Sequence, residues 1–237
     1  MPGAVATGSQ FTGRSSLPAH NPVASTPSGL PGWGPRFAPG TDSIMPSNDS
    51  VRLGNKTWPS LAIVSILLAT AFQLHYQGRL WLCACGPRFW SGNTCSSENS
   101  QQFLDPYSFT HVLHGVVYFI LLKLLLPRVR PLWRLCLAIA FAAGWELLEN
   151  TNLVINRYRE ATAALGYTGD TVVNSLGDIL CCALGFMIAR ALGRRRSVIL
   201  FVATEVVLLF WIRDGLILNI IMLIHPIQAI RTWQMCQ

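Results

Sequence analysis

Long apolar stretches constrain this chain more than any other feature, because a helix needs about 20 apolar residues to cross the hydrocarbon core of a bilayer. Five stretches reach or approach that length, at 58–75, 109–126, 132–150, 171–192 and 197–215. Only 12% of the residues are charged and 51% are hydrophobic, whereas about 25% are charged in a typical soluble domain. The sequence therefore predicts an all-α, polytopic membrane helix bundle of about five spans, surrounded by the lipid bilayer.

The fifth stretch is the least regular of the five. Arg213 and Asp214 interrupt it, and an apolar run resumes at 216–224. Nine residues are too few to cross the membrane again. We therefore expect residues 216–224 to be interfacial or re-entrant.

Basic residues are concentrated in two short connections. One joins the second and third stretches, the other joins the fourth and fifth, and neither contains an acid. Their basic residues are Lys123, Arg128, Arg130, Arg134, Arg190, Arg194, Arg195 and Arg196. An excess of Lys and Arg marks cytoplasmic loops, so we expect a cytoplasmic N-terminus and outer loops at 77–108 and 151–170. The chain has a net charge of +7. Its basic residues flank the apolar runs and form no basic stripe, so we expect no nucleic-acid binding.

The chain divides by composition at about residue 50. Residues 1–50 are rich in Pro, Gly and Ser without an apolar period, which is typical of a disordered tail. Residues 51–237 form the predicted membrane domain. Met45 lies just before the first apolar stretch, so translation could start at Met1 or at Met45.

The first outer loop contains three cysteines, Cys83, Cys85 and Cys95. Their spacing lacks the paired Cys-x-x-Cys of a zinc site, and an outer loop can hold a disulfide. We therefore favour a bond from Cys95 to Cys83 or to Cys85 over a thiolate metal site. The aromatic residues of this loop, Tyr107 among them, are typical of an interfacial belt.

Polar side chains recur in the predicted outer halves of the spans, where ionisable groups are costly and tend to face the bundle interior. Three of the spans carry them at helical spacing, so that the members of each set share a helix face. These residues are His111 and His114, then Glu146, Glu149 and Asn150, then Asp170, Asn174 and Asp178. The fifth span adds Glu205, Arg213 and Asp214.

We expect these residues to form one pocket open to the outer face. Carboxylates suited to acid–base chemistry are the candidate catalytic residues, namely Glu146, Glu149, Asp170 and Asp178. The two imidazoles, His111 and His114, are the candidate metal ligands, because histidine and carboxylates together can bind a divalent metal. The remaining polar groups are candidate binding residues, namely Asn150, Asn174, Glu205, Arg213 and Asp214.

Several functions are compatible with such a pocket. A bound metal could activate water against a lipid or cell-wall headgroup, and the leading interpretation is binding or modification of an envelope lipid or precursor. Without a metal, the same groups could act as acids and bases or relay protons in a transporter. A third alternative is a structural network in which Asn150 and Asn174 bridge helices. The inner halves of the spans are almost wholly apolar apart from Glu205, which counts against transport.

An ordered series of short motifs covers about residues 60–235. It includes His111-Val-Leu-His114-Gly, Trp-Glu146-Leu-Leu-Glu149-Asn and Tyr-Thr-Gly-Asp170-Thr-Val-Val-Asn174-Ser. In this series the chain resembles the uncharacterised protein family 0314, found mainly in alphaproteobacteria. The resemblance implies a multi-pass protein of the cell inner membrane. It implies no activity, cofactor or protein partner.

Overall fold

A computed structural model describes residues 49–162 and 166–235 as helices joined by turns and loops. The helices are α1 (Asp49–Tyr76), α2 (Ser108–Leu125), α3 (Pro131–Glu149), α4 (Asn152–Ala161), α5 (Val172–Leu192), α6 (Arg194–Trp211), α7 (Leu216–Ile224) and α8 (Gln228–Gln234). No β-strand occurs in these ranges, and one isolated bridge joins Trp90 to Leu104. The expected tail before Asp49, and the choice between Met1 and Met45, lie outside the described residues.

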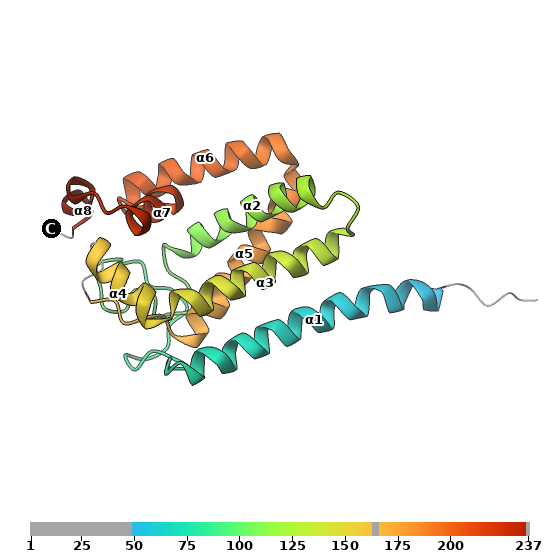
Figure 1. Ribbon diagram of the computed structural model, residues 1–237, viewed down its shortest axis with the longest axis horizontal. Coiled ribbons are helices and arrows are strands. Elements are labelled where there is room, and N and C mark those ends of the chain that lie inside the picture. Colours follow the sequence, from blue (N-terminus) through green and yellow to red (C-terminus); the bar gives the residue numbers. More distant parts are fainter. Residues whose placement is uncertain (1–48, 163–165, 236–237) are drawn as a thin grey trace, which may run out of the picture. The chain divides into compact units, whose positions relative to one another are not determined.

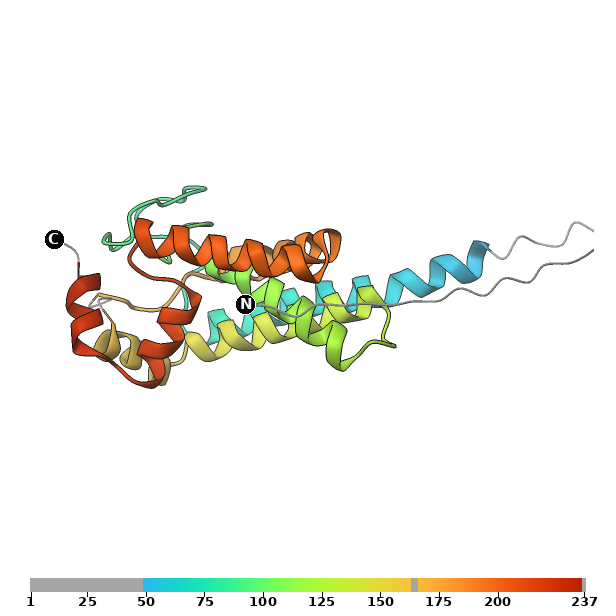
Figure 2. The same cartoon turned by 90° about the horizontal axis from the view of Figure 1, so that it is seen from above.

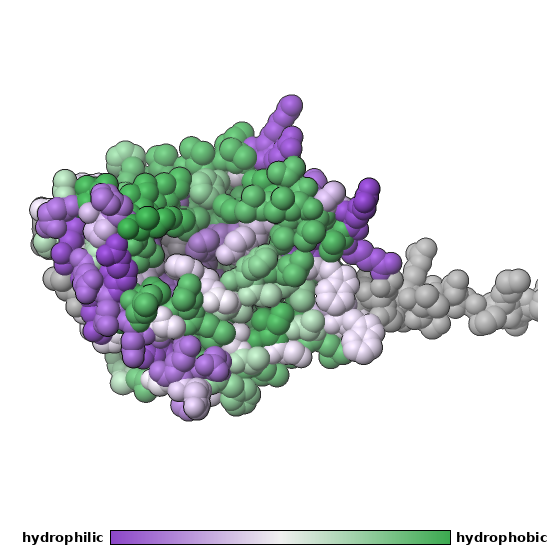
Figure 3. Space-filling model, in the orientation of Figure 1, coloured by the Kyte–Doolittle hydropathy of each residue, from purple (hydrophilic) through white to green (hydrophobic). Residues whose placement is uncertain are grey.

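Four helices are long and apolar enough to cross a membrane, over Thr57–Tyr76, Ser108–Leu125, Pro131–Glu149 and Val172–Leu192. The pair α6 and α7 meets the same criterion only when taken together. Figure 3 shows hydrophobic side chains across the middle of the molecule and hydrophilic ones gathered toward two ends. The predicted fold class, an all-α polytopic helix bundle of about five spans, is confirmed, with four such helices or five if the bent pair counts as one span.

Helices α2 and α5 make the closest contact in the bundle, because glycines remove the side chains where they meet. A Cβ atom at Gly115 of α2 would overlap the backbone carbonyl of Cys182, and one at Gly185 of α5 would overlap that of Val112. Small residues allow such close approach between membrane helices. Phe119 and Phe186 then pack edge to face beside this contact, with ring centroids 5.5 Å apart.

The expected fifth span at 197–215 corresponds to one helix, α6, and the apolar run 216–224 forms a separate helix, α7. Helix α6 ends at Trp211, and α7 leaves at an angle of 71°. The carboxylate of Glu205 explains the break, since it accepts hydrogen bonds from the backbone N–H groups of Leu216 (2.8 Å) and Ile217 (3.3 Å). Glu205 therefore caps the N-terminus of α7, where four N–H groups lack helical partners.

The bundle has two chemically different ends (Figures 1 and 2). Both basic connections, from α2 to α3 and from α5 to α6, lie at one end. Helices α4, α7 and α8 and the long loop before α2 lie at the other. The first N–H groups of α5 fix that loop: Val172 donates to the carbonyl of Leu80 (2.8 Å) and Thr171 to that of Ser100 (3.2 Å). The α5 N-terminus is thus satisfied by the loop rather than by water.

The loop also corrects the expected disulfide. Cys83 is bonded to Cys85, with Cα atoms 5.1 Å apart. Cys95 therefore cannot bond to either residue, and the predicted pairing is wrong. The backbone N–H of Gly86, with φ of 96°, donates to the carbonyl of Cys83 at 3.2 Å, so both cysteines lie within one tight turn.

Candidate functional site

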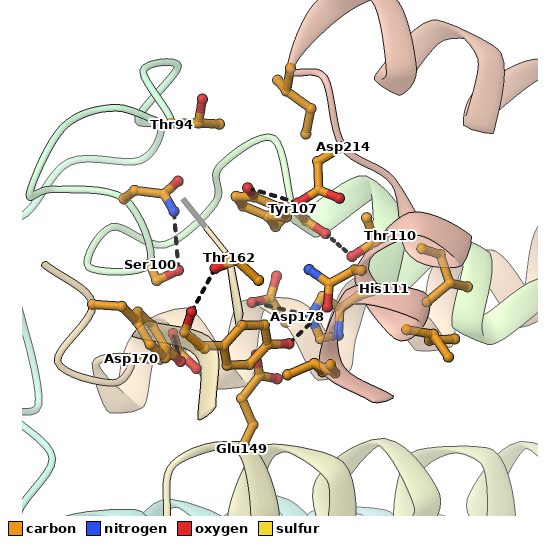
Figure 4. Close-up of a pocket in the computed structure, with 18 of the residues that line it drawn as sticks. Thr94, Ser100, Tyr107, Thr110, His111, Glu149, Thr162, Asp170, Asp178 and Asp214 are labelled. Atoms are coloured by element: carbon orange, nitrogen blue, oxygen red, sulfur yellow. Dashed lines mark hydrogen bonds and ion pairs between the residues drawn. The ribbon is translucent and has the colours of Figure 1, made fainter. Parts of the chain in front are cut away.

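A cavity of about 200 Å³ lies at the end opposite the basic connections. Its walls come from α2, α3, α4, α5, α7, α8 and the loops beside them. Figure 4 labels lining residues from α2, α3, α5 and these loops. Polar side chains make up most of the lining, and α7 adds an apolar wall. The lining includes His111, His114, Glu149, Asp170, Asp178 and Asp214 from the predicted set, and Tyr107, Tyr158, Tyr167 and Asn219 beyond it.

His111 lies at the centre of a group of carboxylates. Its Nδ1 is 3.4 Å from Oε1 of Glu146, and its Nε2 is 3.8 Å from Oδ2 of Asp178. Ser108 holds Asp178 in place by donating its hydroxyl to Oδ1 at 2.8 Å. His111, Glu146 and Glu149 each offer one atom that could bind a metal, a ring nitrogen or a carboxylate oxygen. These three atoms lie within 4.8 Å of one another. Ligand atoms at about 2.1 Å from a tetrahedral metal ion lie about 3.4 Å from one another, so side-chain movements of about 1 Å would complete a site.

Glu146 is fully buried, and neither of its carboxylate oxygens has a hydrogen-bond partner in the described chain. Buried polar atoms are nearly always paired, because leaving one unpaired costs about 1–3 kcal/mol. An unsatisfied buried carboxylate beside a histidine is therefore typical of a group that binds something from outside the chain.

The arginines at this end do not neutralise the cluster. Instead they donate to backbone carbonyls: Arg157 to Leu223 (2.8 Å), and Arg231 to Thr162 (3.1 Å). Arg79, Arg159 and Arg213 likewise donate to backbone carbonyls. No Lys or Arg lines the cavity within the described ranges. The cavity is thus acidic and lacks a cationic partner from the protein.

Three tyrosines donate hydrogen bonds around the rim. Tyr107 donates to Asp214 (3.2 Å), Tyr158 to Asn219 (3.0 Å) and Tyr167 to Asp170 (2.9 Å). Burial raises the pKa of all three phenols well above its ordinary value, and nearby carboxylates raise it further. These hydroxyls are therefore protonated at neutral pH, and each donates its proton to its partner at the rim.

Asp170 links the rim to the bundle. Its Oδ2 accepts from the Asn150 amide at 3.0 Å, and its backbone N–H donates to Oδ1 of Asn150 at 2.8 Å. Burial raises the pKa of Asp170 from 3.8 to about 6, although the hydrogen bonds from Tyr167 and Asn150 lower it. The charged form of Asp170 is therefore disfavoured in the folded protein.

That shift predicts how stability depends on pH in the metal-free protein. A carboxyl with a raised folded pKa contributes most stability below its unfolded pKa of 3.8, and the contribution is lost as pH rises through about 6. About two pKa units correspond to about 3 kcal/mol. We expect the thermal midpoint to be higher at pH 5 than at pH 7, and the difference to shrink in Asp170→Asn. An equal pH response in wild type and variant would contradict this prediction.

The structure separates the predicted binding residues into two groups. Asp214 lines the cavity. Asn150 and Asn174 are bridges: Asn150 joins α3 to Asp170, and Asn174 donates to the backbone carbonyl of Gln102 at 2.8 Å. Glu205 caps α7, and Arg213 donates to the carbonyl of Trp233 at 3.1 Å. None of these four lines the cavity.

The two histidines also differ. His114 lines the cavity, but its ring stacks on Tyr118 with centroids 6.0 Å apart. The group with metal-ligand spacing contains His111, Glu146 and Glu149 without it. Glu146 and His111 lie one on α3 and one on α2, so only the packing of these helices brings them together.

Sequence reasoning missed the aromatic rim. Tyr107 was expected in an interfacial belt, but it lines the cavity and bonds Asp214. Its position immediately before α2, one turn ahead of His111, was the signal that could have placed it. Asn219 was missed because the run 216–224 was assigned by its apolar residues, and the bend after α6 turns it inward.

Comparisons with known proteins match the chain over most of its length. Residues 74–236 match a family described as "Protein of unknown function (DUF2585)". The chain is similar to a "UPF0314 protein" of Paracoccus denitrificans, 41% identical over 177 residues, which covers 74% of this chain and 92% of the relative. Relatives with the same name from Sphingopyxis alaskensis (43% over 178 residues; 73% and 91%) and Novosphingobium aromaticivorans (40% over 194 residues; 79% and 98%) are also similar. No solved structure matches the chain.

Proposed function

Because the chain belongs to the uncharacterised protein family 0314, whose members' names state no activity, we propose a function from the cavity itself. The protein binds a divalent metal ion between His111, Glu146 and Glu149 and acts on the headgroup of an envelope lipid or lipid precursor. The cluster of one imidazole and two carboxylates, in which His111 and Glu146 are buried and Glu149 is partly buried, is the observation that carries the proposal, together with the lack of a Lys or Arg in the described cavity lining. A mixed nitrogen and oxygen ligand set suits Zn²⁺ or Mn²⁺.

The surroundings of His111 support a metal site. Nδ1 of His111 is on the side of Glu146 and would bind the metal, which leaves Nε2–H of the same ring facing Asp178. Ser108 holds Asp178 by a hydrogen bond from its hydroxyl. Metal-bound histidines usually donate their second ring N–H to such a carboxylate, which fixes the tautomer and the ring orientation. Asp178 is then a positioning residue for His111.

The cavity suits a small polar substrate. Ligand pockets for whole small molecules are usually about 300–1,000 Å³, so about 200 Å³ accommodates a headgroup rather than an entire lipid. A bound metal lowers the pKa of water to about 7. In hydrolysis of a headgroup ester, the oxygen of that water would form the new bond to the phosphorus or carbonyl carbon, and the bond to the leaving oxygen would break. Asp170, which lines the cavity, would take the proton from water and return it to the leaving oxygen.

The proposal also assigns the cavity to one side of the membrane. The two basic connections lie at the end opposite the cavity, and the excess of basic residues favours the cytoplasm for that end. The cavity would then open at the outer face of the cell inner membrane. The bacterial sources of the relatives are compatible with that location.

Metal analysis of the purified protein tests the proposal. After incubation with Zn²⁺ or Mn²⁺ and removal of free metal, we expect about one ion per chain in wild type and loss of that ion in His111→Ala and Glu146→Gln. The exposed residues His75 and Glu160 at the same end provide matched controls, and His75→Ala and Glu160→Gln should keep the metal. A wild-type protein without metal, or equal metal content in all variants, would contradict the proposal.

A further inference from the structure

A second cavity, of about 210 Å³, lies among α2, α3 and α5 at the end that carries the basic connections. It is lined by Phe119, Lys123, Pro131, Arg134, Phe186 and Arg190. Three helices each contribute one basic side chain to it, and no acid lines it. The sequence has no Asp or Glu in 115–135 or in 186–204, so this end of the bundle offers no carboxylate on those segments to neutralise the site.

Arg134 is the strongest sign that this cavity holds a ligand. Its Nε is buried and has no hydrogen-bond partner in the described chain. A buried guanidinium N–H usually pairs with a carboxylate or a phosphate, because leaving it unpaired is costly. The Lys123 ammonium lies over the ring of Phe119, with Nζ 5.5 Å from the ring centroid. This cation–π contact holds the ammonium beside the cavity.

The cavity combines charge with apolar walls. Phe119 and Phe186 are buried at 4% and 2% exposure and form its inner surface. Leu124 and Leu125 are 67% and 69% exposed nearby on the last turn of α2, as expected of side chains that face lipid. A ligand with a phosphate and an adjoining apolar part would satisfy both halves of this surface.

We propose that this cavity binds the phosphate group of an anionic membrane phospholipid, with Arg134, Lys123 and Arg190 as its ligands. Basic pockets between membrane helices on the cytoplasmic side are known to take such headgroups. The proposal concerns a site at the opposite end from the metal cluster and does not depend on it. Free inorganic phosphate offers the same chemistry without the apolar part, so the experiment separates the two sources.

Lipid binding to the detergent-purified protein tests this. Short-chain phosphatidylglycerol should raise the thermal midpoint in a saturable way, and short-chain phosphatidylcholine should do so much less. The dissociation constant for phosphatidylglycerol should rise about fivefold for each charge removed, in Arg134→Gln, Lys123→Gln and Arg190→Gln. Lys123 and Arg190 are exposed, so their variants should fold even if the variant of Arg134 does not.

Basic residues of the same hairpin that do not line the cavity provide the matched controls. Arg128→Gln and Arg130→Gln remove the same charge and should change the affinity by less than about twofold. An equal loss in control and cavity variants would show general charge attraction and overturn the site. Inorganic phosphate that displaces the lipid at a comparable concentration would overturn the lipid assignment.

Discussion

Replacing Gly115 by alanine is expected to destabilise the protein severely. The added Cβ would overlap the carbonyl oxygen and carbon of Cys182 and the backbone nitrogen of Phe186. These are backbone atoms of α5, so the helices must move apart rather than a side chain rotate. Overpacking usually costs about 1–3 kcal/mol, and a clash between two backbones should reach or exceed the upper value. The thermal midpoint should fall by at least about 6–12 °C.

Gly144 of α3 is the matched control for this change. A Cβ at that position meets nothing within 4 Å, and alanine has the higher helix propensity by about 1 kcal/mol. Gly144→Ala should therefore leave the thermal midpoint unchanged or slightly raised. Equal midpoints for Gly115→Ala and Gly144→Ala, measured by thermal unfolding in detergent, would contradict the close packing of α2 on α5.

A second large effect is expected at Asn150, and it separates structural from functional polar residues. Asn150→Ala removes the donor to Asp170 Oδ2 and the acceptor for the Asp170 N–H. Both partners are buried, and each orphaned group costs about 1–3 kcal/mol. We expect a loss of about 3 kcal/mol of stability. The exposed Asn152, two residues further along, is the control, and Asn152→Ala should change stability by less than about 0.5 kcal/mol.

Glu146→Gln should behave in the opposite way in the same unfolding experiment. Its carboxylate oxygens accept no hydrogen bond of good geometry in the described chain, so the isosteric amide removes little and replaces an ionisable group at a buried site. The metal-free variant should be at least as stable as wild type. A stability loss in Glu146→Gln as large as in Asn150→Ala would favour the purely structural network over the metal site.

The apolar stretches and the basic connections were sufficient to predict the main spans. The helices α1, α2, α3 and α5 follow from long apolar runs, and Pro131 places the start of α3 at the first helical turn, where proline is tolerated. The closest helix contact was not predictable. It uses Gly115 and Gly185 on different helices, and no Gly-x-x-x-Gly motif in a single span indicates it.

The candidate site was predictable in composition but not in roles. Helical spacing grouped Glu146, Glu149 and Asn150 at the end of α3, but it could not show that Asn150 turns to Asp170 while Glu146 faces His111. Glu205 was expected in the pocket, but its carboxylate accepts hydrogen bonds from the first N–H groups of α7. An acid in the middle of a helix gives no sign in the sequence that the chain folds back to this position. Such assignments depend on tertiary contacts, which hydropathy does not contain.

X-ray absorption at the edge of a bound metal tests the central claim most directly, because it identifies the ligand atoms. For protein loaded with Zn²⁺ or Mn²⁺, we predict a first shell of nitrogen and oxygen at about 2.0–2.2 Å, with one imidazole contribution that disappears in His111→Ala. That loss should not occur in His75→Ala, which removes an exposed histidine at the same end. Sulfur ligands, or an imidazole contribution that survives in His111→Ala, would contradict a metal site between His111, Glu146 and Glu149.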